Sequence, residues 1–202
     1  MIYDITQPLF GCKVFPGDPC PEKVTVMSME KGDICSLTRF SMCAHNGTHV
    51  DAPAHFIRNG KTVDQLEMEK LIGPAYVRTC EGEISGEEAV RILNEAGSLF
   101  PDAGKRILIR GRAVMTEEAA WVFAEQKIGL LGNESQTFGP EDAPAAVHRI
   151  LLGAEVVLLE GICLTDIKDG IYFLHALPID LNGCEGAPCR ATLIDELPVL
   201  KE

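Results

Sequence analysis

Histidines and a carboxylate gather in one short stretch of the chain, between residues 45 and 56. Three of the five histidines and one aspartate stand there, all at odd positions: His45, His49, Asp51 and His55. Successive side chains of an extended backbone point to opposite faces, so these four would point the same way. Neutral imidazoles and a carboxylate suit a divalent metal such as zinc or manganese. The stretch therefore predicts a metal or catalytic site, and the ordinary alternative for any single histidine is a structural hydrogen bond.

The backbone around these residues is predicted to be tightly ordered. Asn46-Gly47 is a turn dipeptide, and Ala52 precedes a proline, which disfavours a helical conformation for that residue. Residues 23–29 and 36–42 alternate well enough to predict two strands joined by a short turn. The second strand leads the chain into the histidine-rich stretch. We therefore expect a strand that continues into a rigid loop, which together position the histidines.

Residues 106–160 have the most regular pattern of the chain. It predicts apolar strands alternating with amphipathic helices, with strands at 106–110, 128–131 and 155–159 and helices at 116–126 and 141–152. That order implies neighbouring parallel strands, right-handed crossovers and helices that cover the strands. Ligands of such sheets bind at the carboxyl ends of the strands. Glu160 directly follows the third strand and Glu134 lies just past the second, which makes both carboxylates candidates for a site.

Further elements are expected on either side of this region. Strands are predicted at 2–6 and 73–80, and two more are predicted within 170–194, around a loop at 181–188. A helix is predicted to begin at the Ser85 cap and to stop at Gly97. His175 lies in an apolar run and is interpreted as a core histidine with a polar partner. The chain has no repeat, linker or low-complexity tract, so we expect one α/β domain over residues 1–202.

Composition disfavours several classes of partner. The formal net charge of -12 makes nucleic acid and anionic membrane surfaces poor partners. No stretch approaches the roughly 20 apolar residues of a membrane span, and the N-terminus lacks the pattern of a signal peptide. The eight cysteines contain no C-x-x-C pair, so we expect mostly free thiols in a reducing cytoplasm. Cys184 and Cys189, which flank a short turn, could pair.

The segment HNGTHVDAPAHF, residues 45–56, resembles the H-x-G-T-H-x-D-x-P-x-H signature of the metal-dependent cyclase-like hydrolases. That family includes bacterial kynurenine formamidases and isatin hydrolases. Supporting resemblance extends from the first residues to about Ile194. The resemblance implies a single α/β domain with a mixed central sheet or barrel-like β core flanked by helices, in the swivelling β/β/α-like manner of the cyclases.

The resemblance also implies a ligand set for the metal. His148 and Glu160 match the family's second ligand pair in identity and spacing, which gives the set His45, His49, Asp51, His148 and Glu160. Asp51 would stand where it could bridge two metals, and His55 would transfer a proton. By itself, His148 is an undistinguished histidine on a helix. Glu160 ends a buried strand and must be solvated, paired or metal-bound, because an isolated buried charge is costly.

The expected substrate pocket departs from the family pattern. Phe15-Pro16-Gly17-Asp18-Pro19 resembles the W-P-G-D-x-P loop of the formamidases, with Phe15 in place of tryptophan. We expect Phe15, Phe56 and Glu134 to contact the substrate. Relatives often carry an aspartate and a serine where this chain has Glu134 and Thr137. These differences bear on the substrate more than on the metal.

The resemblance implies a hydrolase that cleaves an amide-type C–N bond of a small molecule with metal-activated water. One or two Zn²⁺ ions are expected, with Mn²⁺ as the alternative. The substrate would be an aryl formamide such as N-formylkynurenine, as in tryptophan catabolism, or else a cyclic amide, imide or lactone. A member that binds a metal or small molecule without catalysis is the alternative from another class. Relatives imply a homo-oligomer, either a dimer or a tetramer.

Overall fold

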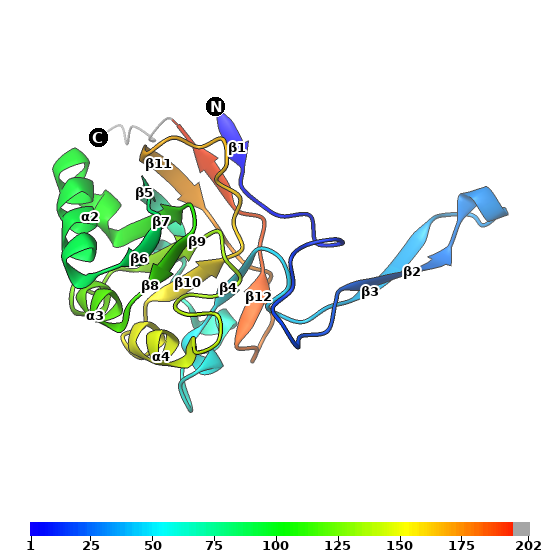
Figure 1. Ribbon diagram of the computed structural model, residues 1–202. Helices are drawn as coiled ribbons and strands as arrows, with labels where there is room; N and C mark the ends of the chain where they lie inside the picture. The colour runs from blue at the N-terminus through cyan, green and yellow to red at the C-terminus, as the bar shows by residue number, and fades with distance from the viewer. Residues whose placement is uncertain (196–202) are drawn as a thin grey trace.

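A mixed sheet of nine strands forms the centre of the computed structural model, which describes residues 1–195 (Figure 1). The sheet curls into a half-barrel. In spatial order its strands are β1 (Ile2–Asp4), β13 (Thr192–Ile194), β11 (Gly170–His175), β5 (Ile72–Thr79), β7 (Arg106–Arg110), β9 (Leu130–Asn133), β10 (Val157–Glu160), β4 (His49–Asp51) and β12 (Gly186–Pro188). The predicted α/β class with a mixed or barrel-like sheet is confirmed.

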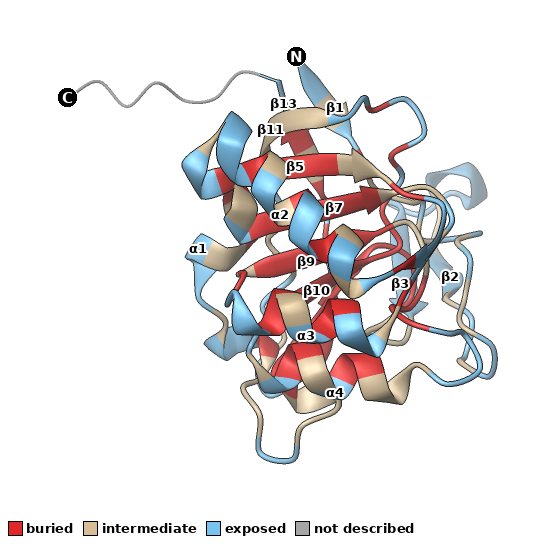
Figure 2. Ribbon diagram, turned by 60° about the vertical axis from the view of Figure 1, so that its left-hand side comes forward, coloured by how far each residue is buried: buried red, intermediate tan, exposed pale blue. Residues whose placement is uncertain are grey.

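The middle of the sheet is the predicted β-α-β-α-β unit. It consists of β7, β9 and β10 with the helices between them, and β5 adds a fourth parallel strand beside β7. Three helices cover one face of these strands (Figure 2): α2 (Gly86–Leu99), α3 (Glu117–Glu125) and α4 (Ala145–Gly153). Ile107 and Ile109 belong to the core beneath these helices, whereas Leu108 belongs to the core on the other face. Both faces are therefore buried, which explains why the strands are continuously apolar.

Local sequence sets the helix ends. The Ser85 and Thr116 hydroxyls accept hydrogen bonds from the backbone three residues on, as N-caps do. The prediction that Gly97 ends its helix is wrong, because α2 continues to Leu99. Phe100 precedes a proline, adopts an extended conformation and ends the helix instead. Helix α4 begins at Ala145, four residues later than predicted, because Pro144 disfavours a helical conformation for the residue before it.

Two small two-stranded sheets flank the main sheet. Strand β6 (Gly82–Ile84) pairs in parallel with β8 (Ala113–Met115). Strand β2 (Glu22–Met27) pairs with β3 (Leu37–Ser41) in the predicted hairpin, which extends away from the body (Figure 1). Short helical turns complete the described elements: η1 (Met29–Lys31), η2 (Pro53–His55), η3 (Val63–Gln65), α1 (Met68–Leu71) and η4 (Pro101–Lys105).

The C-terminal region differs from its prediction. It contains three strands rather than two, because the end of the predicted loop forms β12 and pairs with β4. His175 is exposed and is not a core residue, since it alternates on β11 with the buried Leu174 and points away from the core. All eight cysteines are free, and Cys184 and Cys189 do not pair. Among the described residues, no helix is long and apolar enough to cross a membrane.

Candidate metal centre

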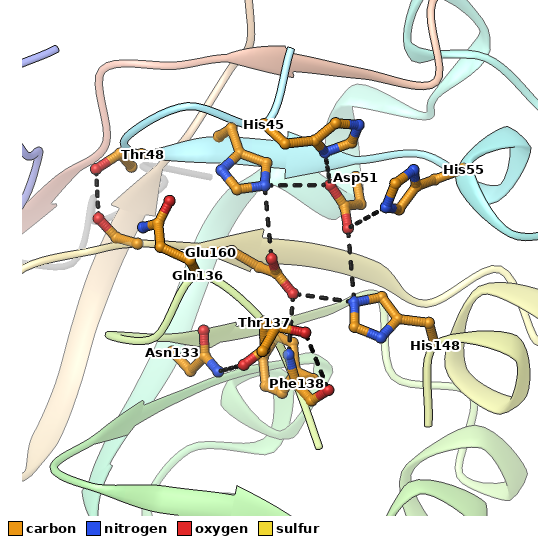
Figure 3. A network of polar contacts seen from close by, with 12 residues as sticks. His45, Thr48, Asp51, His55, Asn133, Gln136, Thr137, Phe138, His148 and Glu160 are labelled. Atoms are coloured by element: carbon orange, nitrogen blue, oxygen red, sulfur yellow. Dashed lines mark hydrogen bonds and ion pairs between the residues drawn. The ribbon is translucent and has the colours of Figure 1, made fainter. Parts of the chain in front are cut away.

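Adjacent strands bring together the polar residues of two distant segments. Strand β4 pairs with β10 in antiparallel register, with His49 opposite Glu160 and Asp51 opposite Leu158. Opposite residues and residues two apart share one face of a sheet, so the side chains of His49, Asp51 and Glu160 point to the same side. Helix α4 covers this side and supplies His148 (Figure 3). The sheet register therefore places the two halves of the candidate site face to face.

The ring nitrogens and carboxylates form two groups that share Asp51. In one, Asp51 Oδ1 lies 2.8 Å from His45 Nδ1 and 3.3 Å from His49 Nε2. In the other, His148 Nε2 lies 3.2 Å from Glu160 Oε1 and 3.9 Å from Asp51 Oδ2. His49 Nε2 also lies 3.5 Å from Glu160 Oε2, which links the groups. The ligand atoms within each group lie within 4.8 Å of one another, close enough to hold a metal ion.

Two of the histidines are locked by backbone carbonyls. His49 donates from Nδ1 to the Gly47 carbonyl at 3.0 Å, and His148 donates from Nδ1 to the Pro144 carbonyl at 2.9 Å. Each ring therefore turns its Nε2 lone pair towards the carboxylates. Second bonds of this kind fix the tautomer and orientation of metal-binding histidines.

Unpartnered polar atoms support a cation at this place. His49 Nε2 and Asp51 Oδ2 are buried and have no hydrogen-bond partner in the described part of the chain. Such atoms are costly to bury unless something satisfies them. A divalent cation between the two groups would satisfy both atoms, so the residues present fit a metal.

The charge balance points to the same conclusion. Asp51 and Glu160 are buried, and within residues 1–195 their cationic neighbours are all imidazoles. Burial alone would lower the pKa of His49, but the nearby carboxylates of Asp51 and Glu160 outweigh it and raise that pKa to about 10. The cluster therefore needs positive charge, which either protons or a metal cation can supply.

A cavity of about 210 Å³ opens over the cluster. His45, His55, His148 and Glu160 form polar parts of its wall, and Phe15, Phe56 and Pro144 form apolar parts. The His55 ring stacks on His45 with centroids 4.0 Å apart, and its Nε2 lies 4.0 Å from Asp51 Oδ2. His55 is thus beside the cluster, and no hydrogen bond from residues 1–195 occupies its Nε2.

One predicted substrate residue lies elsewhere. Both oxygens of Glu134 accept backbone hydrogen bonds, from Gly111 at 2.8 Å and Leu164 at 2.7 Å. Its side chain faces a different cavity. The cavity over the cluster is instead lined by Thr137, already noted as a departure from the family pattern, and by Asp18 and Gln136, which were not predicted as site residues. The sequence pointed to both loops through Phe15 and Glu134. Which side chains of a loop enter the cavity depends on the conformation of its backbone, which the sequence pattern does not give.

Comparisons with known proteins identify the family of this chain. The Cyclase family model matches residues 3–140. A kynurenine formamidase of Erythrobacter litoralis is 30% identical, over 98% of this chain and 94% of the relative. The solved structure of a potential metal-dependent hydrolase with cyclase activity superposes with a TM-score of 0.81 at 26% identity, covering 98% of this chain and 99% of the other. Isatin hydrolase A from Labrenzia aggregata shares the fold, with a TM-score of 0.79 at 22% identity and coverage of 97% and 94%. The chain belongs to the cyclase family.

Proposed function

We propose that the protein is a metal-dependent hydrolase that cleaves an amide-type C–N bond of a small molecule. The observation that carries this proposal is the pair of ligand groups sharing Asp51 beneath the 210 Å³ cavity. Family relatives support the reaction class, since kynurenine formamidase and isatin hydrolase are both named for it.

The proposed ligands are His45, His49, Asp51, His148 and Glu160. Asp51 offers one oxygen to each group, which favours two ions per chain over one. Zinc suits histidine and carboxylate ligands best, and manganese is the alternative. When bound, such a metal supplies a water of lowered pKa and polarises the oxygen of a substrate carbonyl.

The protein's own residues orient the substrate and move the proton. His55 lies on the cavity wall next to Asp51, where its Nε2 can take a proton from the attacking water and deliver it to the leaving nitrogen. Positioned proton transfer of this kind contributes roughly 10²–10⁴-fold to rate. Phe15 and Phe56 present apolar walls to a flat ring. We propose that Glu134 holds its loop through the two backbone bonds rather than contacting substrate.

The substrate we favour is an aryl formamide such as N-formylkynurenine, with small cyclic amides, imides and lactones as the second candidate class. The test is to measure kcat/KM of the zinc-loaded protein for N-formylkynurenine, isatin, a cyclic imide and a lactone. Turnover of any amide-type substrate supports the proposal, and the ranking separates the two classes. A metal-loaded protein inert towards all four would contradict it and favour a non-catalytic binding protein.

We further propose that residues 1–202 form one cyclase-like hydrolase domain and that the protein works in the cytoplasm. Eight free cysteines suit a reducing compartment. Proteolysis of the native protein tests the first point, since one domain predicts no large stable fragment. Blocking thiols in intact cells before lysis tests the second, and oxidised cysteines would contradict it.

We also infer that two copies assemble through the arm formed by β2, η1 and β3. A two-stranded hairpin alone is at best marginally stable in water, yet this one exposes six apolar side chains: Val24, Val26, Met29, Ile34, Leu37 and Phe40. Residues 22–41 carry three basic and three acidic side chains, in a chain of net charge -12. The arm therefore has no net charge of its own, so an acidic second copy would not repel it as it repels the chain as a whole.

A matching surface lies at the root of the arm. A groove of about 710 Å³ is lined by Phe40 of the arm, by Met42 just beyond it, and by Leu177, Pro178 and Ile179 beyond β11. In a two-fold dimer the same patch serves both partners. The groove and the arm meet at the base of the arm. A two-fold axis near the base would therefore place the arm of each copy in the groove of the other.

Sedimentation equilibrium tests this assembly. The wild type should sediment at twice the 22.0 kDa chain mass, and Val26→Asp on the arm should shift it towards the monomer. Val90→Asp introduces the same charge on the exposed face of α2 and should remain dimeric. A monomeric wild type, or equal behaviour of the two variants, would contradict the inference.

A further inference from the structure

His45 differs from the other two proposed histidine ligands in the direction of its ring. His49 and His148 turn Nε2 towards the carboxylates and tie Nδ1 to a backbone carbonyl. In His45 the relation is reversed, because Nδ1 faces Asp51 at 2.8 Å and Nε2 points out of the cluster. Among residues 1–195, no backbone carbonyl accepts a hydrogen bond from His45 Nε2, so another group has to hold this ring.

That group is Glu185. Its Oε1 lies 3.3 Å from His45 Nε2. A carboxylate only accepts hydrogen bonds, so Nε2 is the nitrogen that keeps its proton. With its proton on Nε2, the ring would offer a cation the lone pair of Nδ1, the nitrogen that faces Asp51. Glu185 thus does for His45 what backbone carbonyls do for His49 and His148.

The backbone at the start of strand β12 holds Glu185 and the His45 ring in place. The Glu185 carbonyl accepts a hydrogen bond of 2.8 Å from Ala52, next to Asp51. At the following residue, Gly186, an added Cβ would lie only 2.7 Å from His45 Cε1. The φ of Gly186 is not positive, so the glycine is required here by the close approach of the ring rather than by backbone strain. Two consecutive residues therefore serve the His45 ring: Gly186 leaves room for it, and Glu185 accepts its hydrogen bond.

We propose that Glu185, with Gly186, is a positioning element that seats His45 and selects Nδ1 as its metal-binding atom. This inference rests on the proposed metal-dependent function and adds a residue to it. Partners of this kind orient a ligand and raise its basicity, and their loss typically weakens metal binding about 10–100-fold. The Glu185 side chain is 46% exposed, so its replacement removes the contact without emptying the core.

The first test measures zinc affinity by competition with a chromophoric chelator, without substrate. We expect Glu185→Ala to bind zinc about 10–100-fold more weakly than the wild type. Glu185→Gln, which keeps an acceptor oxygen but loses the charge, should fall between them. Gly186→Ala should also weaken binding, because the ring must move. Asp180→Ala is the matched control: it removes one negative charge from an exposed site in the same β11–β12 connection and should bind like the wild type.

The second test reads the ring directly. Two-bond ¹H–¹⁵N correlation spectra of the zinc-loaded protein should show His45 protonated at Nε2, and His49 and His148 protonated at Nδ1. His45 bound through Nε2, or zinc affinities of the Glu185 variants equal to that of Asp180→Ala, would overturn the positioning role alone. A wild type that binds no zinc would instead overturn the proposed function and this inference with it.

Discussion

Gly161 offers a sharp test of how the two halves of the site are held together. It follows Glu160 and has a positive φ of 67°. Its carbonyl accepts hydrogen bonds from Thr48 at 2.6 Å and from Gln7 at 2.7 Å. An added Cβ would lie 2.1 Å from Gln136 Nε2 and 2.4 Å from the Gly47 carbonyl oxygen. Because that carbonyl holds the His49 ring, the change Gly161→Ala should disturb the metal site as well as the fold.

The size of the effect follows from two contributions. A left-handed backbone conformation costs a residue with a Cβ about 1–2 kcal/mol. Overpacking against fixed backbone adds roughly 1–3 kcal/mol. Gly82 provides the control, since its φ is 74° and an added Cβ would meet nothing within 4 Å. Gly82→Ala should therefore show only the first cost, and Gly161→Ala both.

Urea unfolding of both variants in a metal chelator isolates the fold from the metal. Gly161→Ala should be less stable than Gly82→Ala by about 1–3 kcal/mol, which for about 200 residues lowers Tm by a further 2–12 °C. Zinc affinity, measured separately, should fall only in Gly161→Ala. Equal free energies of unfolding together with unchanged zinc affinity would refute the view that close packing at Gly161 sets the position of His49.

Three further predictions concern single side chains. His55→Gln should lower kcat by roughly 10²–10⁴-fold at unchanged metal content; full activity would remove His55 from proton transfer. Glu134→Gln should cost about 1.5–3 kcal/mol in urea unfolding, because the amide can accept only one of the two backbone hydrogen bonds, while KM stays near its wild-type value. Burial would raise the pKa of Asp169, but hydrogen bonds from Thr79 and Arg78 outweigh it and lower that pKa. The stability that Asp169 contributes is then complete above its ordinary pKa of about 3.9 and is lost as the pH falls through the lower folded value. Asp169→Asn should accordingly flatten the loss of stability below about pH 4 in an acid unfolding series, and an unchanged slope would contradict this.

Much of the architecture could be predicted because local patterns and tertiary packing agree. Strands β7 and β10, which were predicted at 106–110 and 155–159, have apolar side chains on both faces, and a buried parallel sheet is the structure in which both faces are covered. The caps at Ser85 and Thr116 are local hydrogen bonds that depend on a few neighbouring residues. The family was predicted from the motif at 45–56, and its membership is confirmed.

Other features depend on contacts between distant residues, which no local pattern encodes. Glu185 was not singled out in the sequence, because it reaches His45 only after β12 pairs with β4. Glu134 was predicted to contact substrate from its place beyond a strand, yet its oxygens serve two backbone N–H groups. His175 stands in an apolar run, but the alternation along β11 turns it outwards. In each case the fold around the side chain, rather than its own type, decided its environment.

The most direct test of the central claim is the metal content of protein purified without added metal or chelator, measured by elemental mass spectrometry beside Asp51→Asn. The account predicts about two zinc or manganese ions per wild-type chain and almost none in the variant, because Asp51 belongs to both ligand groups. One ion per chain would contradict the sharing of Asp51. A wild type that holds no metal, and takes up none when zinc or manganese is supplied, would contradict the proposed mechanism as a whole.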